Sequence, residues 1–308
     1  MLVTIANYAE SFGTEVSDFS KECRQLMLDY PLEYYVLKGE TRDQVILNVL
    51  RKIDVDTQVI GAAERKDVWE RGWAENLEAF SESHNIADLV PKFIRPRQPV
   101  RFKGNYVMPV ADNFELDYVR VFTTWLFGKY FETCESIYEF GCGSGFNLAT
   151  LAQLFSAKQI TGLDFVDSSV ELANRIGKIC DWNIVGRVFD MFSPDKEYLL
   201  GNNCGVLTSG AIEQLAGRFE DFLQYLLSQP LRICVHIEPT FELYDEDNLL
   251  DYLALKFLSK RGYTQGYLTR LRELAAIGKI ELIKVKRLYF GSLYQEGYMY
   301  IVWRPIRS

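Results

Sequence analysis

Residues 137–147, IYEFGCGSGFN, are the part of the sequence that most constrains the fold. The apolar residues that begin this stretch are typical of a buried strand, and apolar residues at helical spacing follow it. Between them, Gly141, Gly143 and Gly145 allow a sharp turn and a close approach of a ligand to the backbone. The following helix begins with free N–H groups and the positive end of its dipole. The segment therefore predicts a strand, turn and helix that bind a nucleotide-type ligand.

Acidic residues stand at the end of this strand and of the two strands predicted after it. Glu139 belongs to the first strand, Asp164 ends residues 159–164 (QITGLD), and Asp190 follows residues 184–189. The intervals of 25 and 26 residues between these acids suit successive units of strand, turn and helix. In a doubly wound sheet, an acid that ends the second strand can accept hydrogen bonds from both hydroxyls of a ribose. The spacing therefore indicates a ligand that contains a nucleoside.

The first of these acids opens an E-x-G-x-G-x-G pattern that resembles the first motif of class I S-adenosylmethionine (SAM) dependent methyltransferases. The resemblance extends over about residues 115–308 and implies SAM as the cofactor. In this family an acid at the position of Asp190 meets the adenine amino group, beside a main-chain contact from the next residue. The cofactor-binding residues that the resemblance implies are Glu139, Gly141, Cys142, Gly143, Gly145, Asp164, Phe165, Asp190 and Met191. A dinucleotide site fits less well, because G-x-G-x-x-G requires glycine where Phe146 stands.

The rest of the chain completes the pattern of an α/β sheet. The further predicted elements are strands at 205–208 and 231–237, a helical region at 246–276 interrupted near Gly262 and Gly266, and strand-like runs at 280–290 and 298–303. Residues 291–297 are short enough to join the last two runs as an antiparallel hairpin. We expect a doubly wound, seven-stranded, Rossmann-like methyltransferase sheet with an antiparallel terminal hairpin, preceded by a mainly helical N-terminal region. The expected domains are a substrate or cap region at 1–110 and the SAM-dependent methyltransferase domain at 111–308.

A basic stretch precedes the methyltransferase-like part of the chain. Residues 91–109 contain four prolines, which exclude a continuous helix and predict an extended linker. The cations of this stretch have two interpretations: a solvated charged linker, or binding of a phosphate or carboxylate of the acceptor by Arg95, Arg97 and Arg101. Further upstream, Trp69 and Trp73 lie one turn apart on a predicted amphipathic helix, and we expect them to pack the N-terminal region onto the catalytic domain.

A hydroxyl acceptor requires a base, and three residues are candidates at the ends of the fourth and fifth strands. Glu238 is preferred because it lies nearest the open end of the sheet. His236 is a natural base at neutral pH, but an isolated strand histidine is more often a hydrogen-bonded core residue. Glu213 could instead be the N-terminal carboxylate of a helix.

Composition excludes several classes of function. The formal charge of −8 and the pI near 5.1 make nucleic acid an improbable partner. No long apolar run and no signal peptide are present, so we expect a cytoplasmic protein that does not bind a membrane. Six cysteines without C-x-x-C spacing and two histidines make a zinc site improbable, and no metal is expected. The sequence does not predict an oligomeric state.

The expected function is methyl transfer from SAM to a small-molecule acceptor, a hydroxyl of a sugar or related metabolite. This acceptor class comes from a resemblance of residues 236–263 and 290–303 to bacterial methyltransferases of polysaccharide or sugar modification. Two alternatives stay open. One is a nucleotide-dependent oxidoreductase or epimerase that binds NAD, and the other is a noncatalytic SAM-binding partner that regulates a complex.

Overall fold

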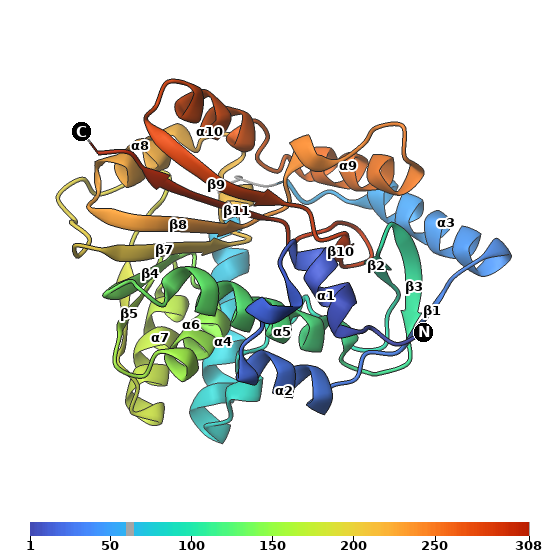
Figure 1. The fold of residues 1–308 in the computed structure, drawn as a ribbon, viewed down its shortest axis with the longest axis horizontal. Coiled ribbons are helices and arrows are strands. Elements are labelled where there is room, and N and C mark those ends of the chain that lie inside the picture. Colours follow the sequence, from blue (N-terminus) through green and yellow to red (C-terminus); the bar gives the residue numbers. More distant parts are fainter. Residues whose placement is uncertain (60–64, 308) are drawn as a thin grey trace.

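The centre of the protein is a seven-stranded sheet with the order β6-β5-β4-β7-β8-β11-β9. The computed structural model describes residues 1–59 and 65–307 (Figure 1). The strands are β4 (Ser136–Phe140), β5 (Gln159–Asp164), β6 (Ile184–Val188), β7 (Cys204–Ser209), β8 (Leu231–Ile237), β9 (Ile280–Lys286) and β11 (Tyr300–Pro305). Strands β4 to β8 are parallel, whereas β11 pairs antiparallel with both β8 and β9. In chain order this sheet therefore reads 3-2-1-4-5-7-6.

Helices cover both faces of the large sheet. One face carries α5 (Phe114–Phe131), α6 (Phe146–Leu154) and α7 (Asp167–Cys180), and α4 (Arg65–Ser83) packs against α7. The other face carries the short helix η3 (Ile212–Leu215), α8 (Glu220–Ser228) and α10 (Tyr267–Ala276). The central strands β7 and β8 are buried on both faces along most of their length, whereas the edge strand β6 is largely exposed.

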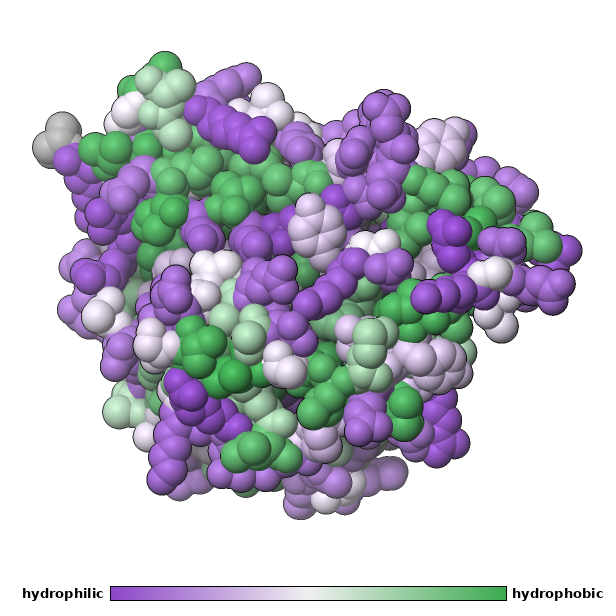
Figure 2. Space-filling model, turned by 45° about the vertical axis from the view of Figure 1, so that its right-hand side comes forward, coloured by the Kyte–Doolittle hydropathy of each residue, from purple (hydrophilic) through white to green (hydrophobic). Residues whose placement is uncertain are grey.

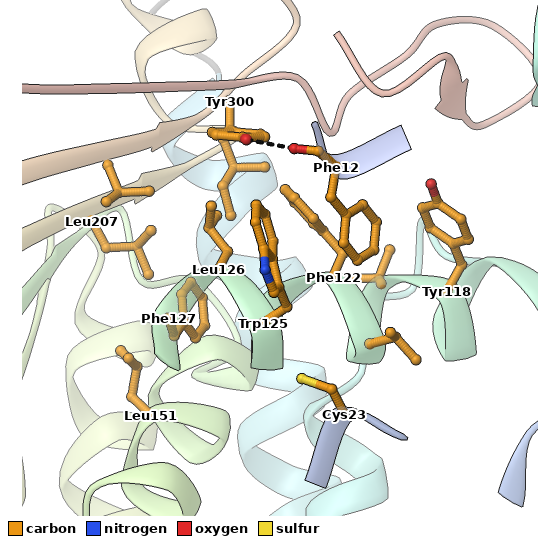
Figure 3. Close-up of a cluster of buried hydrophobic side chains, with 14 of the residues drawn as sticks. Phe12, Cys23, Tyr118, Phe122, Trp125, Leu126, Phe127, Leu151, Leu207 and Tyr300 are labelled. Carbon is orange, nitrogen blue, oxygen red and sulfur yellow. Dashed lines mark hydrogen bonds between the residues drawn. The ribbon is translucent and has the colours of Figure 1, made fainter. Parts of the chain in front are cut away.

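The largest hydrophobic core joins the N-terminal residues to the sheet (Figure 3). Helix α1 (Ile5–Phe12) contributes Phe12. The centroid of its ring lies 5.1 Å from the ring centroid of Trp125 on α5. The hydroxyl of Tyr300 on β11 donates a 2.7 Å hydrogen bond to the carbonyl of Phe12. Residues from both sides of position 110 therefore share one core.

A second, four-stranded antiparallel sheet has the order β1-β3-β2-β10. Its strands are β1 (Tyr34–Val36), β2 (Val100–Phe102), β3 (Asn105–Pro109) and β10 (Phe290–Gly291). The prediction that residues 91–109 form an extended linker is wrong, because residues 100–109 are a hairpin of this sheet. Lys103 and Gly104, with φ of +50° and +71°, make its two-residue turn. The prolines at 99 and 109 lie outside or at the end of the strands, where a missing N–H costs little.

The C-terminal strands pair as predicted, but their connection differs from the predicted hairpin. Strand β9 ends at Lys286, so the run 280–290 is not one strand. Residues 290–291 leave the large sheet and pair with β2. The connection between β9 and β11 therefore contributes an edge strand to the small sheet.

The remaining helices surround the small sheet and the N-terminal residues. They are η1 (Val16–Asp18), α2 (Lys21–Asp29), α3 (Gly39–Val55), η2 (Ile86–Leu89), η4 (Phe241–Leu243) and α9 (Leu249–Arg261). Helix α3 packs on α9, and both lie beside the small sheet at the right of Figure 1. The predicted interruption of the helical region is confirmed, because Gly262 ends α9 and Gly266 precedes α10.

The surface mixes polar and apolar residues on the face that Figure 2 shows. Within residues 1–59 and 65–307, no helix combines the length and the apolar character that a membrane span requires.

Candidate active site

The glycine turn between β4 and α6 is tight and left-handed at three positions. Gly141, Gly143 and Gly145 have φ of +72°, +50° and +73°. The N–H groups of Gly141 and Cys142 both donate to the carbonyl of Leu163 on β5, at 2.7 and 3.2 Å. These φ values favour glycine, so the backbone explains why the sequence has glycine at alternate positions.

Glu139 is buried at the end of β4, and one of its carboxylate oxygens has no hydrogen-bond partner in the described part of the chain. Its side chain is 1% exposed, and its Oε1 accepts a 2.7 Å hydrogen bond from Nδ2 of Asn147 on α6. Its Oε2 is buried and accepts no hydrogen bond from residues 1–59 or 65–307. Burial raises the pKa of Glu139 to about 8, while the bond from Asn147 opposes this shift. A buried oxygen without a donor marks a place where a ligand could supply one.

Asp164 ties the end of β5 to the glycine turn. Its Oδ2 accepts from the N–H of Gly143 at 3.0 Å, and its Oδ1 accepts from the N–H of Val166 at 3.2 Å. Burial raises the pKa of Asp164 to about 6, although these backbone N–H groups favour the charged form. The N–H of Phe165 also favours the charged form, and since a carboxylate has four lone pairs, Asp164 has room for a further hydrogen bond from a ligand.

The other residues predicted to bind the cofactor follow β5 and β6. Met191 reaches the turn, since a Cβ added to Gly141 would lie 3.7 Å from its Cε. Asp190 is exposed, and its Oδ1 accepts from the N–H of Phe192 at 2.8 Å. Phe165 is half-buried, with Nζ of Lys66 5.9 Å from its ring centroid. The structure thus brings Met191 to the glycine turn and places Asp190 and Phe165 at the ends of the neighbouring strands.

Helix α4 covers the glycine turn. A Cβ added to Gly143 would lie 2.9 Å from the ring of Trp73, which confirms that this tryptophan packs the N-terminal region onto the sheet domain. The carboxylate of Glu70 accepts a 3.1 Å hydrogen bond from the N–H of Ser168 on α7. Sequence reasoning missed Glu70. The signal was that Val166, at the N-cap of α7, has no side chain that could cap the helix.

The carboxylate of Glu238 lies just beyond the carboxyl end of β8 and accepts four hydrogen bonds. Its Oε1 accepts from Oγ1 of Thr208 at 2.8 Å and from the N–H groups of Ala211 and Ile212, both at 3.1 Å. Among the described residues, the donor to its Oε2 is the N–H of Glu213, at 3.2 Å. Burial raises the pKa of Glu238 to about 7, although the four donors favour its charged form.

His236 lies on β8, two residues before Glu238, and is fully buried. Its Nδ1 lies 2.9 Å from Oγ1 of Thr208, and its Nε2 lies 2.8 Å from Nε1 of Trp303 and 3.0 Å from the hydroxyl of Tyr267. Burial lowers the pKa of His236 to about 3. The imidazole is therefore neutral at physiological pH, as expected of a hydrogen-bonded core histidine.

Glu213 lies beside Glu238 at a small cavity. Burial, and then repulsion by Glu238, hold the pKa of Glu213 well above its ordinary value. The cavity has a volume of about 10 Å³ and is lined by both carboxyl groups together with Thr240, Thr264 and Tyr267. That volume suits about one water molecule.

The three arginines predicted to bind the acceptor are not brought together. Arg101 is 1% exposed and donates to the carbonyls of Leu250 and Leu293 and to the hydroxyl of Tyr106. Arg97 forms an exposed ion pair with Asp112, and Arg95 is exposed. Across the described part of the chain, no cluster of three or more His, Cys, Asp or Glu side chains could hold a metal ion.

Comparison with known proteins gives similar structures but no similar sequences. No protein-family model and no curated protein sequence matches the chain. The [4+2]-cyclase SpnF matches with a TM-score of 0.51 and 14% identity, covering 82% of this chain and 100% of that one. The 16S rRNA methylase ArmA matches with a TM-score of 0.45 and 17% identity, covering 76% and 98%. The methyltransferase domain of bacterial CtHen1-C matches with a TM-score of 0.45 and 15% identity, covering 61% and 97%.

The sheet order 3-2-1-4-5-7-6, with its inserted antiparallel strand and the glycine turn after the first strand, is the fold of class I SAM-dependent methyltransferases. The predicted fold class is therefore confirmed. The likeness to SpnF concerns this fold alone, and a protein named as a cyclase shows that the fold does not determine the reaction.

Proposed function

We propose that the protein binds SAM at the glycine turn and transfers its methyl group to a hydroxyl of a small polar acceptor, such as a sugar or related metabolite. The observation that carries the proposal is the unpaired Oε2 of Glu139, which is buried beside the turn. Burial keeps this side chain largely protonated at neutral pH, since its pKa is about 8, and a cationic donor of hydrogen bonds such as the ammonium group of SAM would favour its ionised form.

The residues around the turn fit the rest of this cofactor. Asp164 retains lone pairs for the ribose hydroxyls, and Asp190 and Met191 follow the next strand on the side where the adenine is proposed to lie. When bound, SAM supplies an electrophilic methyl group, so the protein has to align the acceptor and receive its proton. Alignment alone can contribute up to about 7 to 11 kcal/mol in well-oriented systems.

Glu238 is the proposed acceptor of the proton. Its Oε2 accepts one hydrogen bond and therefore has room for a second. Its pKa of about 7 matches a general base that works near neutral pH. His236 acts through Thr208 as a positioning residue, because its two ring nitrogens are already occupied.

The acceptor class rests on the resemblance of residues 236–263 and 290–303 to methyltransferases of sugar modification, and one group at this end of the sheet supports it. Glu213 offers a carboxyl group, which suits a polar hydroxyl compound, while the hydroxyls of Thr240 and Thr264 donate to the carbonyls of Glu238 and Ile212. The formal charge of −8 argues against a nucleic acid as the acceptor.

Binding measurements test the cofactor first. Calorimetry should show that the wild type binds SAM and its demethylated product but not NAD. Glu139→Gln should weaken SAM binding, whereas Glu135→Gln should not, because Glu135 is an exposed carboxylate near the opposite end of β4. Binding of NAD in place of SAM would instead support the oxidoreductase alternative.

The acceptor is tested with methyl-labelled SAM and a library of sugars, nucleotide sugars and related metabolites. The proposal expects label in the product fraction of a hydroxyl compound. If SAM binds but no compound in the library or in a cell extract receives label, the noncatalytic binding partner is the better account.

A further inference from the structure

Trp73 occupies the surface of the glycine turn that the proposed ligand needs. Three atoms of its indole ring lie 2.9 to 3.3 Å from the position that a Cβ on Gly143 would take. Trp69 stacks on this ring, with centroids 5.5 Å apart and an interplanar angle of 14°. The guanidinium of Arg65 lies 4.9 Å from the Trp69 centroid. The stack leaves no room for a ligand atom between the indole and the backbone of Gly143.

A second contact holds the same helix to α7. The carboxylate of Glu70 accepts from the N–H of Ser168 at 3.1 Å, and the hydroxyl of Ser168 donates to the carbonyl of Glu70 at 3.0 Å. The carboxylate supplies the side-chain cap that Val166 cannot provide, and it lies at the positive end of the helix dipole. Helix α4 is thus docked on the first turn of α7. This turn follows Asp164 and Phe165, where the ribose is proposed to bind.

At Gly141 the turn packs against two residues outside α4, Ala211 and Met191. A Cβ on Gly141 would lie 2.6 Å from Cβ of Ala211 and 3.7 Å from Cε of Met191. The residues around the turn therefore have the right chemistry for SAM, but the indole of Trp73 lies against the backbone of Gly143.

We propose that helix α4 is a lid, which in this closed state excludes SAM and which must leave Gly143 and Ser168 before the cofactor enters. The inference rests on the proposed function and adds a conformational step to it. The apparent affinity for SAM is then the intrinsic affinity reduced by the fraction of molecules in which the lid is open. Any change that weakens the docking of α4 without touching the cofactor-binding residues should therefore tighten binding.

Two substitutions on α4 test this with a matched control. Glu70→Ala removes the cap on α7, and Trp73→Ala removes the indole from Gly143. Each should increase the association rate and lower the Kd for SAM by about tenfold, the change that corresponds to ~1.4 kcal/mol. Glu78→Ala, an exposed glutamate farther along α4, should leave both constants unchanged. If Glu70→Ala and Trp73→Ala bind SAM with unchanged or weaker affinity, α4 is not an excluding lid.

Fluorine NMR gives a readout independent of affinity. The protein labelled with 5-fluorotryptophan should show one resonance that is absent in Trp73→Phe, and this resonance should shift when SAM is added to the wild type. A Trp73 resonance that stays in place while SAM binds overturns the lid and leaves the proposed function intact. Absence of SAM binding in the wild type and in both α4 variants rejects the lid and the proposed function together.

Discussion

The indole N–H of Trp303 donates a hydrogen bond to Nε2 of His236 at a distance of 2.8 Å. Because an indole nitrogen can only donate, Nε2 is the acceptor and the ring proton lies on Nδ1. The Nδ1–H group then donates to Oγ1 of Thr208, whose hydroxyl donates to Oε1 of Glu238. This chain of hydrogen bonds fixes the orientation of Glu238 from the core of the sheet.

The first prediction is that His236 stays neutral far below neutral pH, because burial lowers its pKa to about 3. Its folded pKa lies below the unfolded value of about 6.5, so its contribution to stability is complete above pH 6.5. The contribution is lost as the pH falls from about 6.5 towards 3. Side-chain ¹⁵N NMR should show no titration of His236 between pH 8 and 5. A midpoint near 6.5 for His236 would contradict this environment.

The second prediction concerns Glu238 as the base. Because the ionised form accepts the proton, the rate with a hydroxyl acceptor should rise with pH through about 7. Thr208→Val removes a donor to the carboxylate, so the rise should move to higher pH. Glu238→Gln should lower kcat by roughly 10² to 10⁴ fold. A rate that is flat between pH 6 and 8 would reject Glu238 as the base.

The same Glu238→Gln substitution should also lower stability. Four donors surround the carboxylate, and a glutamine has only one oxygen to accept from them. The free energy of unfolding should fall by about 1 to 3 kcal/mol, the cost of a buried group left unsatisfied. A binding measurement with SAM therefore has to accompany the kinetic comparison.

The third prediction is that Glu139 makes the protein less stable as the pH rises. Its folded pKa of about 8 lies above the unfolded value, so the folded state holds more protons between about pH 4.5 and 8. Glu139→Gln removes this loss. Its free energy of unfolding, relative to that of the wild type, should therefore rise by up to about 1.4 kcal/mol per pH unit across that range. Urea unfolding at pH 5.5 and 8.5 measures the difference. A constant offset between the two proteins at both pH values would contradict the raised pKa.

The fourth prediction separates Asp164 from its neighbours. Asp164→Ala should weaken SAM binding by about 10- to 100-fold, since hydrogen bonds to a charged group contribute ~1.5 to 3 kcal/mol. Asp167→Ala changes the same charge at an exposed position of α7 and should leave affinity unchanged. Equal losses in the two variants would indicate a general electrostatic effect in place of a ribose contact.

The fifth prediction concerns the arginines of the basic stretch. Arg101→Ala should lower the free energy of unfolding by about 2 to 5 kcal/mol, because two buried acceptors and one partly buried acceptor lose their donor. Arg95→Ala should leave the unfolding midpoint unchanged, because the side chain is exposed. The kinetic prediction from the sequence stands for Arg95 and Arg97 alone: their joint replacement should raise the KM for an anionic acceptor. Unchanged kinetics would favour a solvated surface role.

Short-range patterns were enough to predict the large sheet. The glycine turn and the acids at 139, 164 and 190 recur at the spacing of strand and helix units, and each unit is stabilised by contacts close in sequence. The small sheet was missed because β2 and β10 pair residues 101 and 291, which no local pattern connects. The hairpin turn of Lys103 and Gly104 was the one available signal, and the prolines around it favoured a linker.

The sequence by itself determined the class of fold and the residues of the glycine turn, because left-handed backbone positions and buried strands require particular residue types. Only the tertiary structure decided what the charged side chains do. In the folded protein Arg101 is buried and donates to three acceptors, and Glu238 accepts from four donors. The indole of Trp73 packs against Gly143. These outcomes depend on desolvation and on partners distant in the chain, and both arise only when the elements pack together.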